Sequence, residues 1–144
     1  MKDSESDLIG LATSAMSLPG EHMAVQFQGE RIGRDELNTV AQQTLENLRD
    51  SGLSPGTKIA FIARNHPSAL GAFIGLLAGG YSVRMVYPFQ SAAAIAREIA
   101  ELVPAGIVAD DSDFSDDLRK ILAANNIAGV ALSGMNANAV TAGV

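Results

Sequence analysis

The sequence predicts an α/β fold, a parallel sheet of about four strands with helices on both faces and a small N-terminal hairpin. Short apolar runs rich in β-favouring residues alternate with segments of helical length and spacing. Gly, Pro and Asn mark the boundaries between them. Strands joined by helical crossovers are parallel. The predicted strands are Lys58–Ala63, Ser82–Val86, Gly106–Ala109 and Ile127–Leu132.

The clearest strand–helix–strand unit runs from Gly52 to Pro88. Asn65-His66-Pro67 ends its first strand, and proline is favoured at the first position of a helix, with Asn65 or His66 as the cap. The helix Ser68–Ala78 is apolar or small on every face, which predicts burial on more than one side. Its glycines, Gly71 and Gly75, predict close packing of this helix against the sheet.

Three further helices show one apolar stripe each. The first lies between Gly33 and Gly52, the second covers Ala92–Val103, and the third covers Ser115–Ala124. If Gly33 is the N-cap of the first helix, Glu36 falls at the third helical position, where its side chain can complete the cap.

The two ends of the chain carry weaker signals. Leu8–Ser17 has the spacing of a short amphipathic helix, and the segments around Gly29-Glu30 predict a hairpin. The last twelve residues, 133–144, are small and show no period. We therefore expect an α/β unit over residues 1–132, followed by a tail over 133–144.

Composition sets limits on function. The chain has 144 residues, which fits one domain, and its net charge of −6 argues against nucleic acid or an anionic membrane as the main partner. It has no cysteine, which excludes disulfides and thiolate metal sites. No segment approaches the roughly twenty apolar residues of a membrane span. The acidic, polar start lacks a secretion signal, so we expect a cytoplasmic protein.

The motifs from Val25 to Asp111 occur in an order that resembles the N-terminal region of the adenylate-forming (AMP-binding) superfamily, of the acyl-CoA ligase type. That family has a G-x-x-P-G turn before a strand, an N-x-P helix start, an L-x-A-G helix end and a strand that closes on P-x-N-P. The matching residues here are Gly52, Pro55, Gly56, Asn65, Pro67, Leu77, Ala78, Gly79 and Pro88. The family's Thr before the first helix is Gly33 here, and the first Pro and the Asn of P-x-N-P are missing.

The resemblance implies a function for a longer parent protein. Such a ligase activates a carboxylic acid, a fatty acid or another organic acid, with ATP and Mg²⁺ to an acyl-adenylate, and then transfers the acyl group to CoA. The family's Gly-rich phosphate loop and catalytic lysine lie beyond the matched region, and no such loop occurs in this chain. We therefore expect the 144 residues alone to be inactive and to bind no cofactor or metal, with the rest of the ligase as partner.

Two groups of residues are candidates for a site. Arg64, Asn65 and His66 follow a strand and precede a helix, where open α/β sheets bind ligands. His66 there serves either as an acid or base, or as a helix cap. The aspartates between Asp110 and Asp117 alternate somewhat like a calcium loop, but that loop needs a glycine at its sixth position and a glutamate at its twelfth. We favour helix capping by Ser115 for this second group.

Two alternatives to the ligase remain at this point, a stand-alone flavodoxin-like binding or regulatory domain and a purely interacting paralogue. We also expect the chain to self-associate. The buried-type helix Ser68–Ala78 needs cover on several sides, and the tail 133–144 has little of its own to order it.

Overall fold

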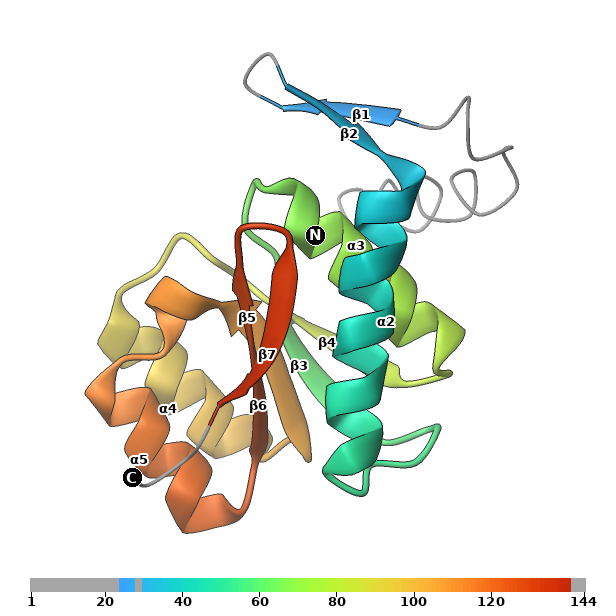
Figure 1. Ribbon diagram of the computed structural model, residues 1–144. Helices are drawn as coiled ribbons and strands as arrows, with labels where there is room; N and C mark the ends of the chain where they lie inside the picture. Colours follow the sequence, from blue (N-terminus) through green and yellow to red (C-terminus); the bar gives the residue numbers. More distant parts are fainter. Residues whose placement is uncertain (1–23, 28–29, 141–144) are drawn as a thin grey trace.

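The computed structural model describes residues 24–27 and 30–140, and all structural statements concern these residues. The predicted helix Leu8–Ser17 lies outside them. Strands β1 (Ala24–Phe27) and β2 (Glu30–Gly33) pair antiparallel and confirm the predicted hairpin. In Figure 1 this hairpin extends away from the body of the molecule, and helix α2 (Arg34–Asp50) leads from it into the body.

The body is a five-stranded sheet with the strand order β4-β3-β5-β6-β7. Strands β3 (Lys58–Ile62), β4 (Ser82–Val86), β5 (Gly106–Asp110) and β6 (Ala128–Ser133) are parallel, as the sequence predicts. Their connections are α3 (Pro67–Ala78), α4 (Ala92–Leu102) and, between β5 and β6, the short 3₁₀ helix η2 (Asp111–Asp113) with α5 (Asp116–Asn125).

The helices form a layer on each side of the sheet (Figure 1). Helices α2 and α3 pack with Phe61 of β3 in one apolar cluster. Helices α4 and α5 pack with Ile62 and Ile107 in the other. Alternate residues of a strand point to opposite faces, so one apolar run supplies both cores. This arrangement confirms the predicted α/β class with helices on both faces.

The structure differs from the sequence prediction at the tail. Residues 136–140 form a fifth strand, β7 (Asn136–Val140), which pairs antiparallel with β6 from Ser133↔Asn136 to Gly129↔Val140. Gly134 supplies the positive φ of the turn. Asn and Ala are poor strand formers, and the pairing with β6 outweighs this weak local preference. The segment is thus ordered within the chain, so it is no longer an argument for self-association.

Helix α3 is buried along nearly its whole length, as predicted, but its glycines face a helix. A Cβ at Gly75 would lie 2.5 Å from the Ala41 carbonyl oxygen, and one at Gly71 would lie 2.8 Å from Cβ of Val40. Both neighbours belong to α2. The glycines therefore let two helix backbones approach closely, and the prediction of helix–sheet contact at these positions is wrong. Cover for α3 comes from the chain itself.

The length and composition of the helices also bear on membranes. In residues 24–27 and 30–140, no helix combines the length and apolar character needed to cross a bilayer.

Candidate functional site

The carboxyl edge of the sheet brings the two predicted groups of residues together. Strands β3 and β5 are parallel neighbours, with Phe61 opposite Val108. The loop after β3 carries Arg64, Asn65 and His66, and the segment after β5 carries the aspartates. The sequence placed each group after a strand, and the strand order decides that they are adjacent.

Arg64 is paired with Asp113 across these two loops. The Arg64 Nε donates to Asp113 Oδ2 at 3.2 Å, and Nη2 makes a second, shorter bond to Oδ1. The Asp113 side chain is only 5% exposed. This hydrogen bonding raises the pKa of Arg64 above its usual value, despite an opposing effect of burial. Arg64 therefore stays charged and joins the start of α3 to the segment before α5.

Sequence reasoning missed the role of Asp113 in this pair. It grouped Asp113 with the other aspartates by spacing alone. Arg64 follows one predicted strand and Asp113 follows another, and these two strands are neighbours in the sheet. That arrangement is the signal from which the ion pair could have been predicted. Bidentate geometry between guanidinium and carboxylate is a strong, directional contact.

His66 caps helix α3. Its Nδ1 accepts a hydrogen bond from the Ser68 backbone N–H at 3.2 Å and lies 2.8 Å from the Ser68 hydroxyl. Pro67 occupies the first helical turn, as predicted. Asn65 is exposed. Of the two roles weighed for His66, the observed contacts are those of the cap, and a substrate-side role for Arg64, Asn65 and His66 stays a prediction.

The acidic segment is organised by local hydrogen bonds. Asp110 Oδ2 accepts from the Ser112 backbone N–H at 3.0 Å and from its hydroxyl at 2.5 Å. The Ser115 hydroxyl accepts from the Leu118 N–H at 3.2 Å and caps α5, which confirms the predicted capping role. Asp116 lies in the first turn of α5, where the helix dipole favours negative charge. Among the described residues, no three His, Asp or Glu side chains are grouped so as to hold a metal ion.

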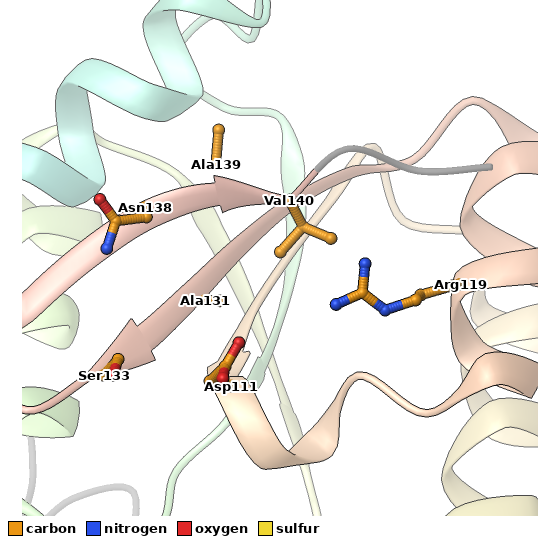
Figure 2. A pocket seen from close by; sticks show the side chains of 7 residues that line it. All are labelled: Asp111, Arg119, Ala131, Ser133, Asn138, Ala139 and Val140. Atoms are coloured by element: carbon orange, nitrogen blue, oxygen red, sulfur yellow. The ribbon is translucent and has the colours of Figure 1, made fainter. Parts of the chain in front are cut away.

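A hollow of about 370 Å³ lies beside this segment, on the side of the sheet covered by α5. Figure 2 shows its lining: Asp111 and Arg119 come from η2 and α5, and the rest come from β6 and β7, namely Ala131, Ser133, Asn138, Ala139 and Val140. The Arg119 Nε donates to the Phe114 carbonyl at 3.2 Å. The sequence could not predict this hollow, because β7 forms part of it and β7 was expected to be tail.

Comparisons with known proteins find similar folds among solved structures that include acyl-CoA ligases. No protein-family model matches the chain, and no curated protein matches it. Among solved structures, MatB from Rhodopseudomonas palustris superposes with a TM-score of 0.67 at 20% identity, over 90% of this chain and 26% of MatB.

Two further structures show the same relationship. A putative long-chain-fatty-acid CoA ligase from Rhodopseudomonas palustris gives a TM-score of 0.62 at 18% identity, over 88% of this chain and 33% of the ligase. The anthranilate CoA ligase AuaEII, solved with anthranoyl-AMP, gives 0.62 at 9% identity, over 82% of this chain and 22% of AuaEII. This chain has an AMP-binding, acyl-CoA ligase fold. It spans about a quarter to a third of the length of these structures, and the predicted resemblance is confirmed at the level of fold.

Proposed function

We propose that the chain forms the N-terminal α/β part of an ATP-dependent acyl-CoA ligase. The parent would convert a carboxylic acid and ATP into an acyl-adenylate and pyrophosphate, and CoA would then displace AMP to give the thioester. The observation that carries the proposal is the fold shared with part of several such enzymes. Two of them were solved with relevant ligands, MatB with ATP and AuaEII with anthranoyl-AMP.

The proposal assigns a supporting role to this part of the enzyme. At the carboxyl edge, the Arg64–Asp113 pair joins the two loops and His66 caps α3. An edge whose loops are joined in this way suits a surface on which other parts of a ligase close around ATP and an acid. ATP, Mg²⁺ and CoA would be held mainly by those other parts, because this chain has no Gly-rich phosphate loop. We place the parent in the cytoplasm, with a fatty or other organic acid as substrate.

The first experiment measures carboxylate-dependent exchange of pyrophosphate into ATP by the 144-residue chain. We expect no exchange above a buffer blank, because the phosphate loop and the catalytic lysine of the family are not in this sequence. Clear turnover by the chain alone would contradict this division of labour.

The second experiment tests the parent itself. An antibody against the 144-residue chain should detect, in cell extract, a product several times longer that catalyses pyrophosphate exchange with at least one acid from a panel. A product with only the mass of the 144-residue chain, with no exchange, would overturn the proposal. That outcome would favour the stand-alone binding or regulatory domain, which the burial of α3 from Pro67 to Leu76 within this chain also permits.

Self-association of the chain stays a prediction. Helix α3 is buried from Pro67 to Leu76, and residues 136–140 pair with β6, so the described parts of the two features that suggested it are covered within the chain.

A further inference from the structure

The hollow of Figure 2 lies where the helical layer of α4 and α5 ends short of the last strand. Helix α5 joins β5 to β6 and shares an apolar cluster with Ala131 of β6. Strand β7 lies one strand further out, and within residues 24–27 and 30–140 no helix follows it to extend this layer. The sheet surface formed by β6 and β7 beside α5 is therefore open.

The floor of the hollow consists of small and apolar residues that packing holds in place. Ala131 lies opposite Asn138, and Gly129 lies opposite Val140, so these side chains share one face of the sheet. A Cβ at Gly129 would lie 3.0 Å from Cβ of Val140 and 3.2 Å from the Phe114 ring, so both are packed tightly against β6. The space above this floor measures about 370 Å³, which is within the usual size range of small-ligand sites.

Two opposite charges line the hollow without pairing. Figure 2 shows the guanidinium of Arg119 directed into the hollow from α5, with Asp111 on another wall, formed by η2. The Arg119 Nε donates to the Phe114 carbonyl at 3.2 Å, and the Asp111 backbone carbonyl accepts from the Phe114 N–H at 3.3 Å. Among the described residues, neither the Nη groups of Arg119 nor the Asp111 carboxylate makes a hydrogen bond or an ion pair. Both charges are therefore available to a ligand.

Two uncharged polar side chains complete the lining of the hollow. Ser133 ends β6 and Asn138 lies on β7, and both are exposed. Neither side chain makes a hydrogen bond to the part of the chain that the structure describes. A hydroxyl and an amide can each donate and accept, so they suit a polar substituent on a ligand that lies between Asp111 and Arg119.

We propose that the hollow binds a small zwitterion, namely an α-amino acid with a short polar side chain. The carboxylate of the ligand accepts hydrogen bonds from the Nη groups of Arg119, because a guanidinium matches the geometry of a carboxylate. The ammonium of the ligand donates to the Asp111 carboxylate, and its side chain lies toward Ser133 and Asn138. A ligand with a single charge leaves one of the two charged walls without a partner, so the two charges together select a zwitterion.

An NMR titration of the 144-residue chain with L-serine tests the site. We expect saturable shifts of backbone amide signals, centred on Asp111 and on residues 131–140. Ethanolamine is serine without its carboxylate, and 3-hydroxypropionate is serine without its ammonium. Each should bind about ten-fold more weakly than L-serine or worse, because the hydrogen bonds to one charged group are lost. Absence of saturable L-serine binding, or equal affinity for either analogue, would overturn the proposal.

Two substitutions assign each charge of the ligand to its wall. Asp111→Asn should weaken L-serine binding about ten-fold and leave 3-hydroxypropionate binding unchanged, because only the ammonium loses its partner. Arg119→Gln should weaken the binding of L-serine and of 3-hydroxypropionate and leave ethanolamine binding unchanged. Asp117→Asn and Lys120→Gln are the matched controls, at exposed positions of α5 outside the hollow, and both should bind L-serine like the unaltered chain.

Asp111→Asn keeps the test decisive if Arg119→Gln disturbs α5 by removing the contact to the Phe114 carbonyl. The Asp111 carboxylate makes no contact that holds the described part of the chain together, so this variant should fold. L-serine binding that survives Asp111→Asn unchanged, or that Asp117→Asn weakens equally, would contradict the assigned site. Either result leaves the ligase proposal untouched, because pyrophosphate exchange tests that proposal separately.

Discussion

The two helical layers are held to the same sheet in different ways. Helices α2 and α3 touch backbone to backbone at Gly75, and α3 buries every residue from Pro67 to Leu76. Helices α4 and α5 each bury one stripe and are fixed at their ends, by the Ser91 and Ser115 N-caps and by left-handed residues at the C-caps. The first layer depends on shape complementarity, so it should tolerate little change. The second depends on local end signals, so single changes should have smaller effects.

The largest effect is expected in the α2–α3 layer. Leu76 is fully buried, whereas the neighbouring Leu77 is partly exposed. Leu76→Asp should unfold the domain, because burying an unpaired charge costs several kcal/mol, of the order of the whole stability of a small domain. Circular dichroism should show no cooperative melting transition. Glu46→Ala, at an exposed position of α2, is the control and should melt like the unaltered chain. A folded Leu76→Asp would contradict the assigned packing.

The next effect concerns the contact that joins the two layers at the carboxyl edge. Arg64→Ala should lower the free energy of unfolding by about 3 kcal/mol, because it leaves the Asp113 carboxylate buried without its partner. Arg97→Ala, at an exposed position of α4, is the control, and it should change stability by less than about 0.5 kcal/mol. Urea titration measures both.

The pH dependence of that loss follows from the raised pKa of Arg64. A cation whose pKa is higher in the folded state stabilises the fold fully below its unfolded pKa, and this contribution is lost only as the pH rises through the folded value. Both values lie far above neutrality for arginine. The difference between the unaltered chain and Arg64→Ala should therefore not change across neutral pH as a result of Arg64 titration. A loss of the difference at mildly alkaline pH would show that Arg64 is not the group responsible.

A smaller effect tests the close approach of α2 and α3. Gly75→Ala should cost about 2 kcal/mol, because the new methyl group would meet the Ala41 backbone and force the helices apart. The better helix propensity of alanine offsets this by about 1 kcal/mol at most. Thermal melting measures the change. Stabilisation would mean that the helices are not in contact at Gly75.

The smallest effect lies in the α4–α5 layer and has the opposite sign. Val103 ends α4 with φ = 43°, and Asn126 ends α5 with φ = 56°. A β-branched residue is strained in this region, whereas asparagine tolerates it. Val103→Asn should therefore stabilise the protein by about 1 kcal/mol, and Asn126→Val should destabilise it by a similar amount. If both substitutions shift the free energy of unfolding in the same direction in a urea titration, the helix ends do not fix this layer.

Much of the fold could be predicted because its signals are local. The run Lys58–Ile62, the Pro67 helix start and the stripe of α2 each report their own conformation through residues a few positions apart. The order of motifs from Gly52 to Pro88 also resembled one enzyme superfamily, and solved structures of that group share the fold. Strand β7 escaped prediction, because Asn and Ala alternate there without an apolar period and its stability comes from β6 and α2.

The sequence by itself predicted the class of fold, the parallel strands, the burial of α3 and the Ser115 cap, and it left the α3 cap open between Asn65 and His66. These features could be predicted because hydrophobic period and turn residues a few positions apart indicate them. Tertiary structure alone decided that Arg64 meets Asp113, that Gly71 and Gly75 face α2, and that Gln43 and Asn47 bind the backbone N–H and C=O of Ala137. These contacts join residues between 31 (Val40 and Gly71) and 94 (Gln43 and Ala137) positions apart. Predicting them requires the strand order and the helix layers, because neither hydrophobic period nor turn chemistry indicates which distant segments become neighbours.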